Sequence, residues 1–333
     1  MRPRFHPRLI NGPFDDPGLF IPFLFENRAI LFDAGDLTAL SSRDILKISH
    51  VFVSHTHMDH FIGFDRLLRL FLGRDKNLYM YGPRGFLQNV EGKLAGYAWN
   101  LVNSYNYPFR LIVSEVRPQG LFTQEYPCRD KFLPRQKPDS AHFTEELHAE
   151  ESFKVTCTTL EHRIACLAFC IHERFQVNIN KNALQSLGLE TGPWLTRFKK
   201  ALYNRTDPNS AFAVEMTGGQ KEKAFQLGRL AEQIAIITPG QKIAYVTDVV
   251  YNDANIEKII EFARNADHLF IEATFLDQDR NMAAEKCHLT ARQAGELAAR
   301  AKARQFTLFH FSPRYLGQED LIYREASEAF ESH

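Results

Sequence analysis

One short motif constrains this chain more than any other part of its sequence. It follows the apolar run of residues 50–53 and holds four candidate metal ligands within six residues: His55, His57, Asp59 and His60. On a helix such closely spaced side chains would scatter around the axis, whereas on a strand that runs into a loop they can converge. Imidazole and carboxylate ligands without a thiolate are typical of hydrolytic sites that hold Zn²⁺, Mn²⁺ or Fe²⁺. The alternative, a chance histidine-rich turn, is disfavoured because a strand pattern precedes the motif and a helical pattern follows it.

The overall composition excludes several classes of protein. The chain has 333 residues, 44% of them hydrophobic, and 40 Lys and Arg balance 40 Asp and Glu. These values exclude global disorder, and the balanced charge argues against a protein whose main role is to coat nucleic acid. The five cysteines are odd in number and form no Cys-x-x-Cys pair, which favours a reducing compartment. Because no apolar run could span a membrane or serve as a signal peptide, we expect a cytoplasmic enzyme without a membrane segment.

The pattern of apolar segments predicts a layered α/β fold. Near the N-terminus, two short apolar runs at 19–25 and 29–32 read as a hairpin. In the last third, expected strands alternate with expected helices: strands at 242–247, 268–271 and 306–311, helices at 255–265, 290–302 and 320–330. Thr290 and Gln293 have the spacing of a capping box at the start of one of these helices. Most polar residues fall at strand ends, so we expect the chemistry at one edge of a sheet.

Two segments depart from this pattern. Residues 117–152 contain four prolines among many charged residues, and we interpret them as a long loop or insertion. Residues 174–205 are polar and poorly periodic, with six Lys or Arg against the single acid Glu190. This excess of positive charge is what phosphate binding would need, although an ordinary solvated surface is the alternative.

Together with four further motifs, the His-x-His-x-Asp-His segment resembles the metallo-β-lactamase superfamily. The four lie at 32–35, 160–162, 245–248 and 309–315. The resemblance implies an αββα four-layer sandwich that spans residues 1–333 as a single domain, with the ligands on loops along one edge. It also implies two divalent metal ions, which we expect to be Zn²⁺, with Mn²⁺ or Fe²⁺ as alternatives.

The resemblance further implies a role for each ligand. One metal would take His55, His57 and His162, the other would take Asp59, His60 and His310, and Asp248 would bridge both. Asp33 would support the ligand loop from behind. Two ions about 3.5–4 Å apart lower the pKa of a bridging water and clamp the attacking and leaving oxygens. A hydroxide would then attack phosphorus, and Asp59 would accept or orient its proton.

Within the superfamily, the chain is most similar to the ribonuclease Z family. The features that carry this resemblance are the ending His-Phe-Ser-Pro-Arg-Tyr at 310–315, the paired motifs at 271–275 and 288–290, and the Gly-Pro tip at 187–193. They imply a homodimeric endoribonuclease that removes 3′ trailers from precursor tRNA, with 174–205 as a substrate-binding arm. The implied substrate-binding residues are Gly192, Pro193, Lys199, Lys200 and Arg314.

One departure from the family pattern affects the expected chemistry. The family motif at 271–275 begins with His, but this chain has Ile271, which cannot protonate a leaving oxygen. Losing a general acid costs about 10²–10⁴ in rate unless another group replaces it. His288 is the candidate replacement, and Glu272 is a candidate supporting residue. The departure keeps two alternatives open: a hydrolase of cyclic nucleotides or other small phosphodiesters, and a metal-bearing RNA-binding protein with little turnover.

Overall fold

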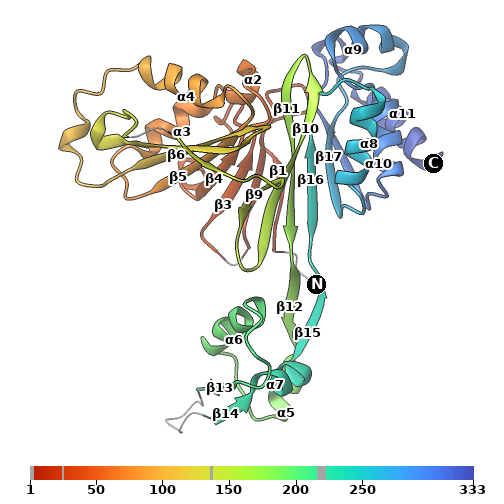
Figure 1. The fold of residues 1–333 in the computed structure, drawn as a ribbon. Coiled ribbons are helices and arrows are strands. Elements are labelled where there is room, and N and C mark those ends of the chain that lie inside the picture. The colour runs from red at the N-terminus through yellow and green to blue at the C-terminus, as the bar shows by residue number, and fades with distance from the viewer. Residues whose placement is uncertain (1–3, 25, 136–137, 216–222) are drawn as a thin grey trace. The chain divides into compact units, whose positions relative to one another are not determined.

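The computed structural model describes residues 4–24, 26–135, 138–215 and 223–333. The chain divides into two compact units (Figure 1). The first unit comprises Met1–Leu147, Val155–Cys170 and Lys242–His333, and the second comprises His148–Lys154 and Ile171–Gln241. No helix of the described residues has both the length and the apolar character needed to cross a membrane.

The first sheet of the first unit has eight strands in sequential order. Its strands are β1 (Arg8–Leu9), β2 (Leu19–Pro22), β3 (Ala29–Phe32), β4 (Ile48–Phe52), β5 (Asn77–Gly82), β6 (Arg110–Arg117), β7 (Gly120–Pro127) and β8 (Asp139–Ala141). The expected hairpin is confirmed, because β2 and β3 pair antiparallel with Leu19 opposite Phe32. Strands β3 to β6 are parallel to one another, so their carboxyl ends meet at one edge of the sheet.

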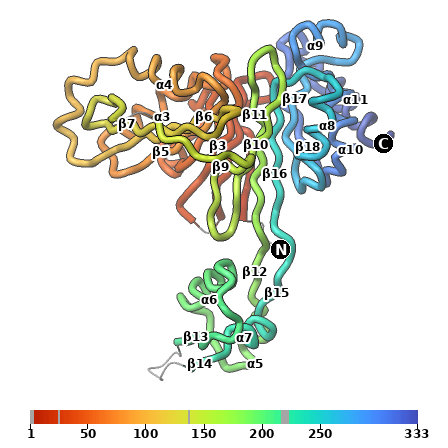
Figure 2. The backbone as a smooth tube through the Cα atoms, viewed as in Figure 1, coloured from red at the N-terminus to blue at the C-terminus, as the bar shows by residue number. Residues whose placement is uncertain are grey.

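The second sheet has six strands in the order β18-β17-β16-β11-β10-β9. These are β9 (Glu146–Ala149), β10 (Phe153–His162), β11 (Ile164–Glu173), β16 (Lys242–Val246), β17 (His268–Glu272) and β18 (Phe306–Phe309). Strands β16, β17 and β18 are parallel neighbours (Figure 2). Their carboxyl ends therefore also share one edge.

Two hydrophobic cores and a layer of aromatic rings make the unit a four-layered sandwich. Helices α3 (Phe64–Phe71) and α4 (Phe86–Ala95) share one core with the first sheet. Helices α8 (Asp253–Phe262), α10 (Ala291–Arg300) and α11 (Glu319–Glu331) share the other with the second sheet. Between the sheets, the ring of Phe32 lies 5.3 Å from that of Phe169 and 5.9 Å from that of Tyr245. The predicted αββα fold is confirmed.

The interpretation of residues 117–152 as a loop is wrong for much of that range. Strand β7 pairs with β6 along its full length, from Arg117 opposite Gly120 to Arg110 opposite Pro127. The prolines do not interrupt the ladder, because Pro118 lies in the hairpin turn and Pro127 is the last residue of the strand. Strands β8 and β9 also fall in this range.

The second unit has a small core of its own. Strand β12 (Phe175–Ile179) pairs antiparallel with β15 (Ala235–Pro239), and β13 (Ala211–Val214) pairs antiparallel with β14 (Lys223–Gln226). Its helices are α5 (Lys181–Ser186), α6 (Trp194–Tyr203) and α7 (Leu227–Ile234). Trp194 and Phe198 of α6 are buried with Leu184 and Leu230. The range 174–205, which we interpret as a substrate-binding arm, falls entirely within this unit.

Candidate metal centre

The loop after β4 carries the first four candidate ligands. Strand β4 is buried between β3 and β5, and after it the chain turns into the short helix α2 (Met58–Phe61). The turn packs against the loop after β3: Ala34 N donates to His60 O at 2.9 Å, and Gly63 N donates to Ala34 O at 2.8 Å. A Cβ atom at Gly35 would lie only 2.4 Å from Asp59 O, so only glycine allows this approach.

Asp33 holds this loop from beneath. Its fully buried carboxylate accepts hydrogen bonds from Ser54 N at 2.6 Å, from Ser54 Oγ at 2.8 Å and from Tyr245 Oη at 2.9 Å. The same carboxylate lies 2.9 Å from His60 Nδ1. Because a carboxylate only accepts, His60 Nδ1 is the donor, and the lone pair of the ring is left on Nε2. Asp33 thus orients His60 in the way that metal ligation requires.

The remaining candidate ligands come from three other strand ends. His162 ends β10, Asp248 follows β16 and His310 follows β18. His162 Nδ1 donates to Cys287 O at 2.8 Å, which leaves Nε2 free to bind a metal. Asp248 and His310 have φ angles of 39° and 63°, in the left-handed region that residues other than glycine rarely adopt. Such strain is concentrated at functional sites, where the surrounding structure maintains it.

The ligands form two groups that meet at Asp248. On one side, Asp248 Oδ2 lies 3.6 Å from His55 Nε2 and 3.5 Å from His162 Nε2. On the other side, Asp248 Oδ1 lies 3.4 Å from His60 Nε2 and 3.7 Å from His310 Nε2. The remaining two candidates complete the groups: His57 Nδ1 lies 2.9 Å from His55 Nε2, and Asp59 Oδ2 lies 3.1 Å from His310 Nε2. The two oxygens of one carboxylate thus face different ligand groups.

These spacings fit divalent metal ions. Around a tetrahedral ion with bonds of about 2.1 Å, neighbouring ligand atoms lie about 3.4 Å apart, close to the distances to Asp248. The fully buried His60 Nε2 has no hydrogen-bond partner in the described structure, although it lies 3.4 Å from both Asp248 and Asp59. A buried polar atom without a partner is costly. An ion between these groups would satisfy it.

The protonation states of the ligands point the same way. Burial lowers the pKa of His55 to about 2 and also lowers the pKa of His57, so both rings are neutral near pH 7. Burial opposes ionisation of Asp59, but His310 and His60 outweigh it and hold the pKa of this carboxyl below its usual range. Burial likewise opposes protonation of His60, yet Asp248 and Asp33 raise its pKa. As a metal ligand His60 would be neutral, with its remaining proton on Nδ1 towards Asp33.

A hydrogen-bonded pair of a buried carboxylate and a partly buried imidazole lies beside the ligands. Glu272, the last residue of β17, accepts hydrogen bonds from Val249 N at 2.8 Å and Thr274 Oγ1 at 2.5 Å. Its Oε2 also lies 3.0 Å from Nδ1 of His288, which follows α9 (Arg280–Lys286). Burial opposes protonation of His288, but the Glu272 carboxylate outweighs it and raises the pKa of the imidazole to about 9. The His288 ring lies 5.1 Å from that of His162, at the centre itself.

The departure at Ile271 does not alter the composition of this site. Successive side chains of a strand face opposite sides, so Ile271 and Glu272 point in opposite directions. Ile271 is fully buried in the hydrophobic core shared by the second sheet and its helices. Of these two neighbouring residues, Glu272 is the one that is hydrogen-bonded to His288.

The comparisons with known proteins identify the family of this chain. Residues 209–311 match the model of the beta-lactamase superfamily domain. A ribonuclease Z of Treponema pallidum is 30% identical over 315 residues, which cover 92% of this chain and 84% of the relative. The chain belongs to the ribonuclease Z family of the metallo-β-lactamase superfamily. A ribonuclease Z of Deinococcus radiodurans is 28% identical over 289 residues, covering 86% of this chain and 83% of the relative.

Solved structures share the fold of this family member at lower sequence identity. The metallo-β-lactamase fold protein YhfI from Bacillus subtilis is 17% identical with a TM-score of 0.55, and the match covers 98% of this chain and 94% of that one. The short form of human tRNase Z is 18% identical with a TM-score of 0.50, and the match covers 94% and 93%. Both likenesses concern the fold alone.

The predicted substrate-binding residues lie in two different places. Four of them belong to the second unit: Gly192 and Pro193 immediately before α6, and Lys199 and Lys200 within it. Arg314 lies in the first unit, in a single 3₁₀ turn at Pro313–Tyr315, where its guanidinium lies 3.4 Å from Asp279. An acidic partner thus already holds Arg314.

Sequence reasoning missed the polar residues that hold the ligands in place. Tyr245 and Ser54 bind Asp33, and Thr274 lies between Glu272 and His310, with its Oγ1 3.3 Å from His310 Nδ1. Thr274 and Tyr245 stand inside motifs that the sequence had singled out for other residues. A hydroxyl residue two or three positions from a candidate site residue could therefore have indicated these supporting residues.

Proposed function

We propose that this chain is a metal-dependent endoribonuclease that removes 3′ trailers from precursor tRNA. The observation that carries the proposal is the pair of the buried Glu272 and the partly buried His288 next to two ligand groups joined by Asp248. Cleavage of an RNA phosphodiester releases a poor leaving group, an alkoxide, so a positioned proton donor matters. Relatives named ribonuclease Z, similar over more than four-fifths of their own length, also support the proposal.

Two divalent ions held by these ligands would activate water at neutral pH and neutralise charge on the phosphate oxygens. We expect Zn²⁺, and the same ligand set accepts Mn²⁺ or Fe²⁺. Asp59 stays ionised next to His310 and His60, so its carboxylate can orient the attacking water by accepting a hydrogen bond from it. His288 is held through Nδ1 by Glu272, which leaves Nε2 to donate a proton to the leaving oxygen.

The Glu272–His288 pair favours this reading over a hydrolase of small phosphodiesters. That alternative arose because Ile271 lacks an acidic proton. His288 supplies one from a different element, and a substrate with an activated leaving group would not need it. The second unit, with its basic residues on α6, would bind the body of the tRNA through phosphate contacts.

The resemblance also predicts a homodimer that acts in the cytoplasm. Sedimentation of the purified chain over a range of concentrations would test the dimer. A species with the mass of one chain at all concentrations would exclude it.

The direct test compares two substrates with the metal-loaded chain. One is a precursor tRNA that carries a 3′ trailer, and the other is bis(p-nitrophenyl) phosphate, whose leaving group needs no proton. The controls are His57→Ala, which removes a ligand, and His268→Gln, which changes a histidine at the opposite end of β17. We expect trailer cleavage by the wild type and by His268→Gln, and none by His57→Ala. Turnover of the small diester alone would exclude the tRNA assignment, and inactivity on both with metal bound would exclude the enzyme assignment.

A further inference from the structure

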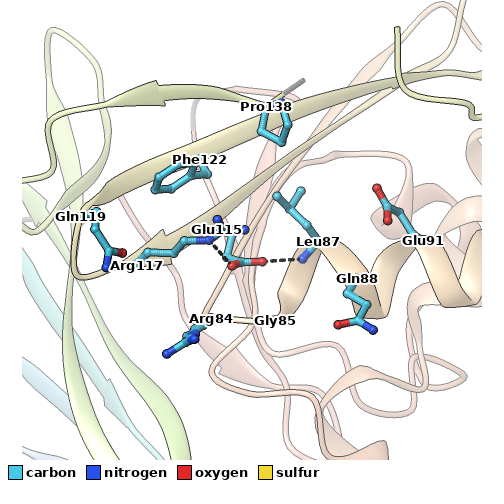
Figure 3. Close-up of a pocket in the computed structure, with 10 residues that line it drawn as sticks. All are labelled: Arg84, Gly85, Leu87, Gln88, Glu91, Glu115, Arg117, Gln119, Phe122 and Pro138. Atoms are coloured by element: carbon cyan, nitrogen blue, oxygen red, sulfur yellow. Dashed lines mark hydrogen bonds and ion pairs between the residues drawn. The ribbon is translucent and has the colours of Figure 1, made fainter. Parts of the chain in front are cut away.

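The first unit contains a pocket that none of the metal ligands lines. It has a volume of about 710 Å³ and lies between the start of α4 and the β6–β7 hairpin (Figure 3). Arg84, Gln88 and Glu91 line it from α4 and the residues before it, and Arg117, Gln119 and Phe122 line it from the hairpin. The volume lies within the range of about 300–1,000 Å³ that is typical of small-ligand sites.

The pocket lies at the same sheet edge as the metal centre. The metal loop follows β4, α4 follows β5, and Arg117 ends β6, and these three strands are parallel neighbours. Strands β4 and β6 are two strand spacings apart, or about 10 Å. A direct contact links the two places, because Asn89 Nδ2 of α4 donates to Oγ1 of Thr56, between His55 and His57, at 2.6 Å. The pocket is thus near the cleavage position without overlapping it.

The charges in the pocket leave one guanidinium group, that of Arg84, without an ion pair in the described part of the chain. The buried carboxylate of Glu115 uses both of its oxygens: one accepts from Leu87 N at 2.9 Å, the other from Arg117 Nε at 2.5 Å (Figure 3). The Glu115 carboxylate therefore already compensates the partial positive charge at the N-terminus of α4. Arg117 is further held over the ring of Phe122, 4.3 Å from its centroid. Arg84 is exposed and has no ion pair within the described part of the chain.

These groups match the chemistry of a nucleotide. Guanidinium groups bind phosphate oxygens, the Gln88 and Gln119 amides offer both donors and acceptors to a base edge, and an arginine stacked on an aromatic ring is a platform for a base. The Glu115 carboxylate is already paired with Arg117, and the polar lining disfavours an apolar ligand. Glu91 also lines the pocket, and its Oε1 accepts a hydrogen bond from Tyr126 Oη at 2.8 Å.

We propose that this pocket binds one unstacked nucleotide of the RNA strand, next to the bond that is cleaved, with Arg84 on its phosphate and Arg117–Phe122 against its base. The inference rests on the proposed endoribonuclease function, because it names the part of the substrate that lies beside the metal centre. It assigns to Arg84 and Arg117 a role in positioning RNA.

Arg84→Gln tests the phosphate contact, since Arg84 is exposed and its loss leaves no buried partner. With the metal-loaded chain and precursor tRNA, we expect KM to rise about 5- to 10-fold and the salt dependence of binding to weaken by about one phosphate contact. Arg84→Lys keeps the charge and should restore the salt dependence. Arg324→Gln, an exposed arginine of α11, is the matched control. Equal KM and salt dependence in Arg84→Gln and the wild type would overturn the proposal.

Photo-crosslinking locates the nucleotide without requiring cleavage. A precursor tRNA with 4-thiouridine at successive positions around the cleavage site is irradiated with the metal-loaded chain, and the attached peptides are identified by mass spectrometry. Crosslinks to residues 84–91 or 117–122 from one position support the pocket, and crosslinks only elsewhere overturn it. If the wild type crosslinks there but does not cleave, the proposed function fails and the pocket stands. If the wild type cleaves and Arg84→Gln behaves as the wild type, the pocket proposal fails and the proposed function stands.

Discussion

The metal centre and the second unit differ in how firmly their functional residues are held. At the centre, each supporting group has several buried partners, as Asp33 has in Ser54, His60 and Tyr245. In the second unit, Arg197 and Lys200 of α6 are exposed, and Arg197 pairs with Glu215 while both side chains are about half exposed, at 49% and 50%. Such exposed ion pairs contribute little to the stability of the fold. Substitutions should therefore act sharply at the centre and gradually in the second unit.

The sharpest expected effect is that of His288→Gln. Removing the proton donor should lower kcat for precursor tRNA by about 10²–10⁴. The loss for bis(p-nitrophenyl) phosphate should be much smaller, because p-nitrophenolate leaves without a proton. Steady-state rates on both substrates give the comparison, with His268→Gln as the matched control. Equal losses on both substrates would mean that His288 supports the site instead of donating a proton.

Glu272→Gln should have an intermediate effect. The amide keeps the shape of the side chain but loses the negative charge that stabilises the protonated His288 ring. Substituting such a supporting group typically costs about 10–100-fold. In the double variant with His288→Gln, the two losses should not add, because both act through one proton donor. Additive losses in the measured kcat would show that Glu272 acts independently of His288.

In the second unit, the double variant Lys199→Gln/Lys200→Gln should have a graded effect. If both side chains contact phosphates, the slope of log binding constant against log salt should decrease by up to about 1.8. KM for precursor tRNA should rise several-fold, and more than KM for bis(p-nitrophenyl) phosphate. Lys302→Gln, an exposed lysine of the first unit, is the control. An unchanged salt slope would remove these two lysines from the binding surface.

The smallest expected effect lies away from both regions, at His268. Burial lowers its pKa to about 4, below the value of about 6.5 in an unfolded chain. Between these pH values the unfolded state binds a proton that the folded state does not, so stability falls as pH decreases from about 6.5 to about 4. In His268→Gln the decrease in Tm between pH 7 and pH 4.5 should be smaller than in the wild type. An identical decrease would show that this histidine does not contribute to acid sensitivity.

The candidate ligands that the sequence singled out come together in the fold, because each stands in a short motif at the end of a strand. His55, Asp248 and His310 follow β4, β16 and β18, which belong to the parallel parts of the two sheets, and His162 ends β10. The contacts that orient the ligands were beyond prediction, because they join distant residues. Tyr245 and Asp33, for example, are 212 positions apart.

Two segments were harder to predict for physical reasons. The prolines near β7 suggested a loop, yet they fall at its ends, where a strand tolerates them. Helix α6 escaped notice because its buried face consists mainly of Trp194 and Phe198, two residues at i and i+4 in a polar segment. The pocket at Arg84 had no motif at all, since its residues come from a helix start and a hairpin that only the fold brings together.

The most direct test of this account is a titration of the metal-free chain with Zn²⁺. Bound metal per chain and cleavage of precursor tRNA are measured in the same samples, with Asp248→Asn alongside. Because Asp248 faces both ligand groups, we predict that activity appears as the second ion binds and that the variant reaches neither two ions nor activity. Full activity with one ion per chain would contradict the account.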